Sequence, residues 1–241
     1  MTTPRLRATL FDVDGTLTLP RDDLSARALQ AALVEGYGLE KIDLSLLRRE
    51  GLTSRQAVIT LAERHGVSSA EALAQAQEVL FLRNIHYGAL VAAERGVHKL
   101  ATTPYAKEFL AALSEAHIHM GLVTGNSEFI ARTKLVRAGL DPTLFAVGAY
   151  GDTPERREDL VATAIERMRI YLAALSAQEV LVVGDAPADI RAGSAVGCRT
   201  LAVASGSWSA DELDACGPDL LVDSLEPTPK LLRYILGGPH R

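Results

Sequence analysis

The feature that most constrains the fold is a series of short apolar runs separated by helical patterns. The run at 180–183, Val-Leu-Val-Val, contains no polar residue, as expected for a parallel strand covered by helices on both faces. Further strands are predicted at residues 6–13, 118–123, 144–147, 200–204 and 220–222. Because strands that alternate with helices form parallel, doubly wound sheets, the predicted fold class is α/β with a Rossmann-like core.

The alternation stops between residues 19 and 96, where only helical patterns occur. Helices are expected there at residues 22–37, from 54 to a glycine at 66, and from 68 or 69 onward. We therefore predict a core domain of residues 1–18 and 97–241 with an inserted helical cap domain of residues 19–96. Thr103 and Pro104 are predicted to open the first helix after the insertion, as N-cap and first helical residue.

Composition limits the partners and the compartment. A net charge of −5 and a pI near 5.7 give no basic footprint for nucleic acid, and no apolar run reaches membrane-spanning length. Cys198 and Cys216 form neither a disulfide framework nor a metal-type spacing. With no apolar signal core at its start, the chain is expected to be soluble and cytoplasmic, with monomer and homodimer both left open.

Two carboxylates follow the first predicted strand. Asp12 and Asp14 stand at i and i+2 and lean to the same side, so that their charges need a cation or a proton. One can stay ionised as a nucleophile or metal ligand while the other carries a proton for transfer. Gly15 permits a tight turn and close approach to a bound anion, and Thr16 follows it.

Polar residues also follow two other strands. Thr124, Gly125 and Asn126 precede a helix and can hold a phosphoryl group. Asp185 offers the hard oxygen ligand that Mg²⁺ prefers. Asp189 can orient the Asp185 carboxylate without binding the metal itself. Because parallel strands bind ligands at their carboxyl ends, we expect one phosphate site and one metal site at this edge.

These segments carry a family resemblance. Residues 12–16, Asp-Val-Asp-Gly-Thr, resemble the first motif of the haloacid dehalogenase-like superfamily; residues 123–126 resemble its second and residues 184–189 its fourth. Residues 195–219 resemble the closing section of phosphoglycolate phosphatase-like members. The resemblance implies a Mg²⁺-dependent phosphomonoester hydrolase with a C1-type helical cap, acting on a small phosphorylated metabolite such as phosphoglycolate or a sugar phosphate.

The resemblance also implies residue roles. Asp12 attacks phosphorus to form an aspartyl-phosphate, and Asp14 protonates the leaving group and then activates water. Mg²⁺ is held by Asp12, the backbone carbonyl of Asp14, and Asp185. The residues expected to bind the phosphorylated substrate in the core are Gly15, Thr16, Thr124, Gly125 and Asn126.

The third motif departs from the family pattern. The lysine usually found before the fourth strand is missing, since residues 140–179 contain no lysine. Arg156 and Arg157 stand in that loop, and either could neutralise the aspartyl-phosphate. We favour Arg157, because the following Glu-Asp-Leu-Val enters the helix as in arginine-bearing relatives; Lys134 is a weaker candidate.

The cap is expected to select the leaving group. Thr53 and Arg55 lie where relatives place a substrate-facing loop, with Arg48 and Arg49 as neighbouring alternatives. A solvated surface position is the simpler interpretation of any one of these arginines.

Two alternatives remain open at this stage. A hexose-phosphate mutase shares the cap type and the Asp pair, and Arg55 lies near a cap arginine of such enzymes. A non-catalytic phosphate-sensing or protein-binding member would explain the missing lysine. Asp14 argues against a dehalogenase, which usually lacks the second aspartate.

Overall fold

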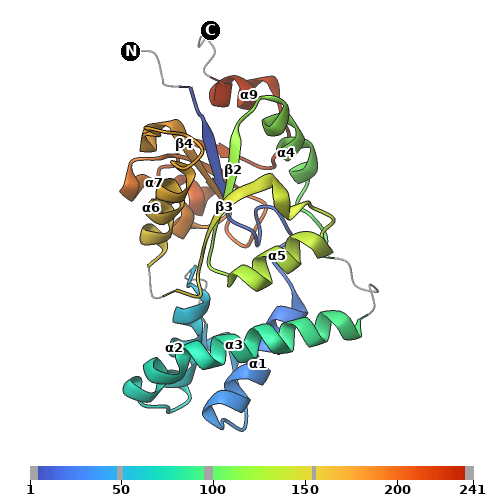
Figure 1. Ribbon diagram of the computed structural model, residues 1–241, viewed down its shortest axis with the longest axis vertical. Helices are drawn as coiled ribbons and strands as arrows, with labels where there is room; N and C mark the ends of the chain where they lie inside the picture. The colour runs from blue at the N-terminus through green and yellow to red at the C-terminus, as the bar shows by residue number, and fades with distance from the viewer. Residues whose placement is uncertain (1–4, 48–50, 95–99, 154–155, 237–241) are drawn as a thin grey trace.

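The computed structural model describes residues 5–47, 51–94, 100–153 and 156–236 and contains one parallel sheet of six strands in the order β3-β2-β1-β4-β5-β6 (Figure 1). All the predicted strands are present, which confirms the predicted fold class. Their bounds are β1 Ala8–Phe11, β2 His119–Thr124, β3 Phe145–Tyr150, β4 Val180–Gly184, β5 Arg199–Val203 and β6 Leu220–Val222.

Helices cover both faces of this sheet because successive strand residues point to opposite sides. In β1, Leu10 packs toward α6 and α7, whereas Phe11 packs toward α4, α5 and α9. Both side chains are fully buried. The bounds of the core helices are α4 Ala106–Glu115, α5 Glu128–Arg137, α6 Arg157–Met168, α7 Pro187–Val196, α8 Ala210–Asp214 and α9 Pro229–Leu236.

Three helices form a separate unit at the end of the molecule opposite both termini (Figure 1). They are α1 (Asp23–Tyr37), α2 (Ser54–Arg64) and α3 (Ser69–Ala93), and they share an apolar core that includes Leu33, Leu61 and Val79. All three lie within the predicted cap range. The predicted boundary between residues 96 and 97 falls outside the described residues.

The two connections between the core and the cap run side by side. Leu19 N–H donates to the Ala101 carbonyl at 2.9 Å, and Thr103 N–H donates to the Leu17 carbonyl at 3.2 Å. This backbone pairing places the cap directly over the loop that carries Asp12.

The predicted start of α4 is wrong. The helix begins at Ala106, after Tyr105 in the left-handed conformation (φ 63°), and not at Pro104. The Thr103 hydroxyl donates to the Thr16 carbonyl at 2.5 Å. That bond fastens the cap connection and removes the group that would have capped the helix.

The last core helix before β4 also differs from expectation. The sequence predicts a helix over residues 159–171, but α6 runs from Arg157 to Met168. Its N-terminus is closed by Asp159, whose carboxylate accepts from the Arg156 N–H at 3.1 Å. The earlier start places Arg157 on the first helical turn.

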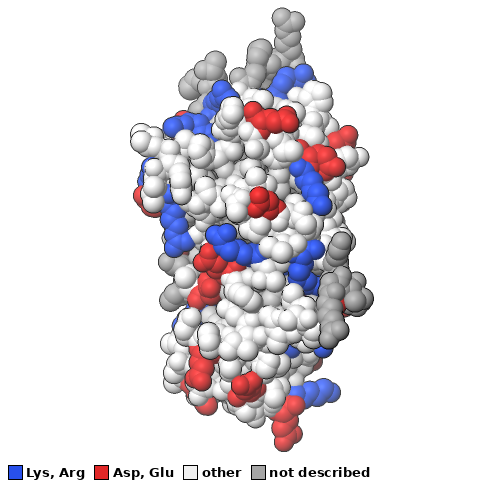
Figure 2. All heavy atoms as spheres, turned by 45° about the vertical axis from the view of Figure 1, so that its right-hand side comes forward, with Lys and Arg blue, Asp and Glu red and all other residues white. Residues whose placement is uncertain are grey.

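The described helices, surface charges and cysteines have the following features. None of the described helices is long and apolar enough to cross a membrane. Lys and Arg are interspersed with Asp and Glu on the described part of the face in Figure 2, without a continuous basic area there. Cys198 is buried and Cys216 is partly exposed, and both are free thiols.

Candidate active site

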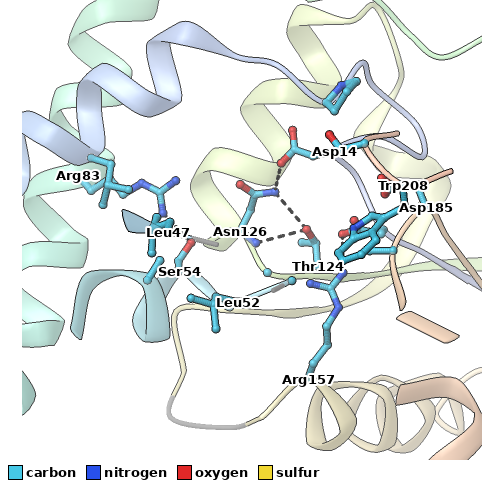
Figure 3. A pocket seen from close by; sticks show the side chains of 18 residues that line it. Asp14, Leu47, Leu52, Ser54, Arg83, Thr124, Asn126, Arg157, Asp185 and Trp208 are labelled. Carbon is cyan, nitrogen blue, oxygen red and sulfur yellow. Dashed lines mark hydrogen bonds and ion pairs between the residues drawn. The ribbon is translucent and has the colours of Figure 1, made fainter. Parts of the chain in front are cut away.

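The carboxyl ends of β1, β2 and β4 meet the cap around a cavity of about 340 Å³. From the core, Asp12, Thr124 and Asp185 line it; from the cap, Ser54 and Arg83 do so (Figure 3). Residues of all three sequence motifs therefore line one cavity, and residues of the inserted helices cover it.

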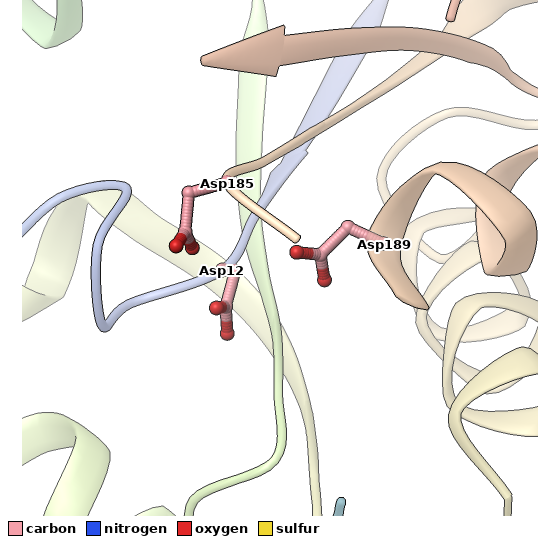
Figure 4. Close-up of side chains that lie close together, drawn as sticks. All are labelled: Asp12, Asp185 and Asp189. Carbon is pink, nitrogen blue, oxygen red and sulfur yellow. The ribbon is translucent and has the colours of Figure 1, made fainter. Parts of the chain in front are cut away.

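An acidic cluster forms the floor of this region. One carboxylate oxygen from each of Asp12, Asp185 and Asp189 lies within 4.8 Å of the others, and all three residues are buried (Figure 4). Burial, opposed by Arg157, raises the pKa of Asp12, and burial, Asp12 and Asp189 raise the pKa of Asp185. Three buried carboxylates so close together need positive charge.

Arg157 supplies part of that charge. Its Nη2 lies 3.0 Å from Asp12 Oδ1, and its Nε donates to Asp189 Oδ1 at 2.9 Å. Burial alone would lower the pKa of Arg157, but Asp189 and Asp12 raise it overall. The neighbouring Arg156 points outward, with 72% of its side chain exposed. Of the two arginines considered from the sequence, Arg157 is therefore the one that contacts Asp12.

One arginine would not balance three carboxylates with all of them ionised, so their full ionisation calls for a further cation. The donors are carboxylate oxygens, which are the ligands that Mg²⁺ and other hard divalent ions prefer. Asp189 is already held by Arg157, so Asp12 and Asp185 are the carboxylates freer to coordinate an ion. The residues present fit a divalent metal.

Asp14 has its own partners. Lys134 Nζ donates to both of its carboxylate oxygens at 2.7 Å, and Asn126 Nδ2 donates to Oδ2 at 2.7 Å. Lys134 is buried, whereas the Asp14 side chain is 28% exposed toward the cavity. The side chain of Asp14 therefore lies apart from the acidic cluster, and its predicted share in metal binding, through the backbone carbonyl, stays a prediction.

The two residues after Asp14 support Asp185. Gly15 has φ 82°, and a Cβ there would lie 2.3 Å from Asp185 Oδ2, so only glycine fits. The Thr16 hydroxyl donates to Asp185 Oδ1 at 3.3 Å. Their predicted contact with substrate stays a prediction.

The second motif joins the core to the cap. Asn126 bonds the Thr124 hydroxyl through its backbone N–H and its side chain, and Thr124 itself is fully buried at the end of β2. The Gly125 carbonyl accepts from the Ser54 N–H of the cap at 2.6 Å. A Cβ at position 125 would lie only 2.7 Å from the Leu52 carbonyl oxygen, which explains why this position is a glycine.

Thr53 and Arg55, the cap residues predicted to face the substrate, make other contacts in the structure. Thr53 is fully buried as the N-cap of α2, where its hydroxyl accepts from the Gln56 N–H. Arg55 is partly exposed, and its N–H donates to the Gly151 carbonyl. Neither is among the residues that line the cavity, and their role in specificity stays a prediction. The alternatives Arg48 and Arg49 lie outside the described residues.

The sequence analysis missed Arg83, the cavity-lining arginine of α3. It lies on the same helical stripe as Val79, Leu80 and Tyr87, all of them buried. A charged residue on an otherwise apolar stripe was the signal that could have identified it.

Comparisons with known proteins identify the family of the chain. Residues 6–197 match the family model described as haloacid dehalogenase-like hydrolase. Phosphoglycolate phosphatase of Escherichia coli O157:H7 is 29% identical over 253 residues, covering 98% of this chain and 94% of its own length.

Two solved structures share the fold. CbbY from Rhodobacter sphaeroides in complex with phosphate is 22% identical, with a TM-score of 0.69 and coverage of 92% of this chain and 96% of its own. A β-phosphoglucomutase from Clostridium difficile is 18% identical, with a TM-score of 0.67 and coverage of 96% and 97%. At these identities the likeness concerns the fold alone.

Proposed function

The chain belongs to the haloacid dehalogenase-like hydrolases and is a phosphatase, and we propose that it hydrolyses a small phosphorylated metabolite through an aspartyl-phosphate on Asp12. The family match confirms the resemblance drawn from the three motifs. The observation that carries the proposal is the contact between Asp12 and Arg157 inside a buried acidic cluster that opens on the cavity.

We propose that Asp12 and Asp185, with the backbone carbonyl of Asp14, hold Mg²⁺. When bound, the ion neutralises charge on the nucleophile and on the transferring phosphoryl group. The excess of buried negative charge supports this assignment, because Arg157 alone leaves the cluster with more carboxylates than cations.

The chemistry divides into two displacements at phosphorus. In the first, a carboxylate oxygen of Asp12 forms a bond to phosphorus while the ester P–O bond breaks, and Asp14 gives its proton to the departing alkoxide. In the second, Asp14 takes a proton from water as the water oxygen attacks phosphorus, and the bond to Asp12 breaks. Lys134 and Asn126 hold the Asp14 carboxylate in place for both steps.

Arg157 and the second motif position the phosphoryl group. The Arg157 guanidinium keeps the Asp12 carboxylate oriented and offers further N–H donors toward the cavity. Thr124, Gly125 and Asn126 line the cavity beside it, before the N-terminus of α5. The cap covers this region and limits the access of water.

Phosphoglycolate is the first substrate to test. The relatives named phosphoglycolate phosphatase cover nearly the whole chain, and a cavity of about 340 Å³ accepts a small ester. A sugar phosphate is the next candidate.

The test is phosphate release from a panel of phosphomonoesters, with Mg²⁺ and with EDTA. We expect Mg²⁺-dependent release that Asp12→Asn abolishes, while Asp223→Asn, which changes an exposed carboxylate, keeps wild-type activity. Release that persists in Asp12→Asn would contradict the nucleophile assignment. Conversion of glucose 1-phosphate to glucose 6-phosphate faster than phosphate release would favour a mutase, and no turnover of any ester would favour a non-catalytic role.

A further inference from the structure

We propose that Arg83 of the cap binds a carboxylate on the leaving group, so that the protein selects small phosphate esters that carry a carboxylate. The inference rests on the proposed phosphatase function and concerns the part of the substrate that faces away from Asp12. It assigns a specificity role to a residue outside the core motifs.

Arg83 is a buried cation with unused donors. Only 7% of the residue is exposed. Its Nη1 donates to the Ser54 hydroxyl at 2.7 Å, and its Nη2 donates to the Ser25 hydroxyl at 3.0 Å. Its Nε is buried without a hydrogen-bond partner among the described residues. A guanidinium has five N–H donors, and two neutral hydroxyls do not satisfy them.

No carboxylate of the described residues forms an ion pair with Arg83. The acidic groups that influence it are engaged elsewhere: Asp14 by Lys134, and Asp22 by Arg137. Burial consequently lowers the pKa of Arg83, to about 10, which still leaves the group charged at neutral pH. An unpaired buried charge is costly in free energy, and a bound anion would remove that cost.

The position of Arg83 in the cavity indicates what the anion belongs to. Arg83 reaches from α3 toward Ser54 on the cap side, whereas Arg157 and Asp185 lie on the core side (Figure 3). A phosphoryl group next to Asp12 would therefore direct its leaving group toward Arg83.

The surroundings of Arg83 favour a single negative charge. The rest of the cap side is formed largely by aliphatic residues, including Leu29, Leu52 and Ala57. One guanidinium with one cavity-lining hydroxyl, that of Ser54, matches a carboxylate. A second phosphate, with more charge and three acceptor oxygens, calls for more donors than these residues supply.

The test compares three esters that differ only at the far end: 2-phosphoglycolate, ethyl phosphate and ethylene glycol bisphosphate. For wild type we expect kcat/KM for 2-phosphoglycolate to exceed that for ethyl phosphate by about 10- to 100-fold, the usual worth of charged hydrogen bonds. Arg83→Met should remove most of this preference, chiefly by raising KM for 2-phosphoglycolate, and leave ethyl phosphate within about threefold of wild type. Arg83→Lys should restore part of the preference. Arg27→Met, at an exposed arginine of α1, should leave it unchanged.

Each other outcome has a distinct meaning. Equal losses for 2-phosphoglycolate and ethyl phosphate in Arg83→Met would make Arg83 a structural residue and overturn the inference. A preference of wild type for the bisphosphate that depends on Arg83 would replace the carboxylate with a second phosphate. If Arg83→Met does not fold, equal wild-type rates for 2-phosphoglycolate and ethyl phosphate would overturn the inference on their own. No release from any ester by wild type would overturn the proposed function, and this inference with it.

Discussion

Replacing Arg157 with methionine tests the electrostatic organisation of the site. The change removes a buried cation that contacts Asp12 at 3.0 Å and Asp189 at 2.9 Å, while keeping an unbranched side chain that fills the space of the arginine stem. Among the described residues, no other arginine forms an ion pair with the acidic cluster.

The size of the effect follows from these distances. At about 3 Å and an effective dielectric constant near 20, each contact corresponds to roughly 5 kcal/mol of Coulomb attraction. The cost of burying the ions offsets much of this, and removing one partner of a buried pair usually destabilises by about 3–5 kcal/mol. Because the remaining carboxylates can bind protons, the loss is largest at alkaline pH and smaller near pH 5.

The assay is urea denaturation of the metal-free protein in EDTA at pH 8 and pH 5, with Arg156→Met as the matched control. We expect Arg157→Met to lower the free energy of unfolding by about 3–5 kcal/mol at pH 8, and by less at pH 5. Arg156→Met should change it little, since that side chain is 72% exposed. A loss below about 1 kcal/mol in Arg157→Met, or one equal to the control, would refute the reasoning.

The same variant tests the catalytic proposal. Loss of a preorganised charge beside the reacting group typically lowers kcat by about 10²- to 10³-fold. We expect a loss of that size for Arg157→Met and wild-type turnover for Arg156→Met. Near-normal turnover in Arg157→Met, with the fold intact, would assign the charge-stabilising role to another residue.

Three further predictions concern the neighbouring residues. Burial raises the pKa of Asp185 to about 8, so the stability that this carboxyl contributes is lost as the pH rises from about 4 through 8. Asp185→Asn should therefore stabilise the metal-free protein by roughly 4 kcal/mol more at pH 9 than at pH 5, and an equal gain at both pH values would contradict this. Gly125→Ala places a Cβ 2.7 Å from the Leu52 carbonyl, and should lower kcat/KM about tenfold by pushing the cap from the core; unchanged kinetics would argue against that contact. Tyr87→Phe removes a hydroxyl that donates to Asp22 at 2.6 Å, and should cost about 1–2 kcal/mol in urea denaturation; no shift in midpoint would show that the bond adds nothing.

Much of the fold was predictable because strand patterns are local. A short, valine-rich apolar run such as Val180–Val183, followed directly by Gly184, is typical of a buried parallel strand. The start of α4 was not predictable in this way, since the hydroxyl of Thr103 bonds Thr16, a residue distant in sequence. Helix ends depend on such long-range partners.

The residues of the candidate site also differ in how far local sequence determines their positions. The three motifs placed Asp12 and Asp185 at one edge of the sheet, because their positions follow from strand ends. Their partners were harder to assign: that Lys134 holds Asp14 depends on how α5 packs against the first loop. Arg83 lies outside every motif, and only the packing of the cap over the core brings it to the cavity.

The central claim is that Asp12 carries the phosphoryl group between substrate and water. The stereochemical course at phosphorus, followed with a chiral, isotopically labelled thiophosphate ester, tests it without requiring the intermediate to accumulate. Two successive in-line displacements predict net retention of configuration. Net inversion would show that water attacks the substrate directly, and would contradict the account.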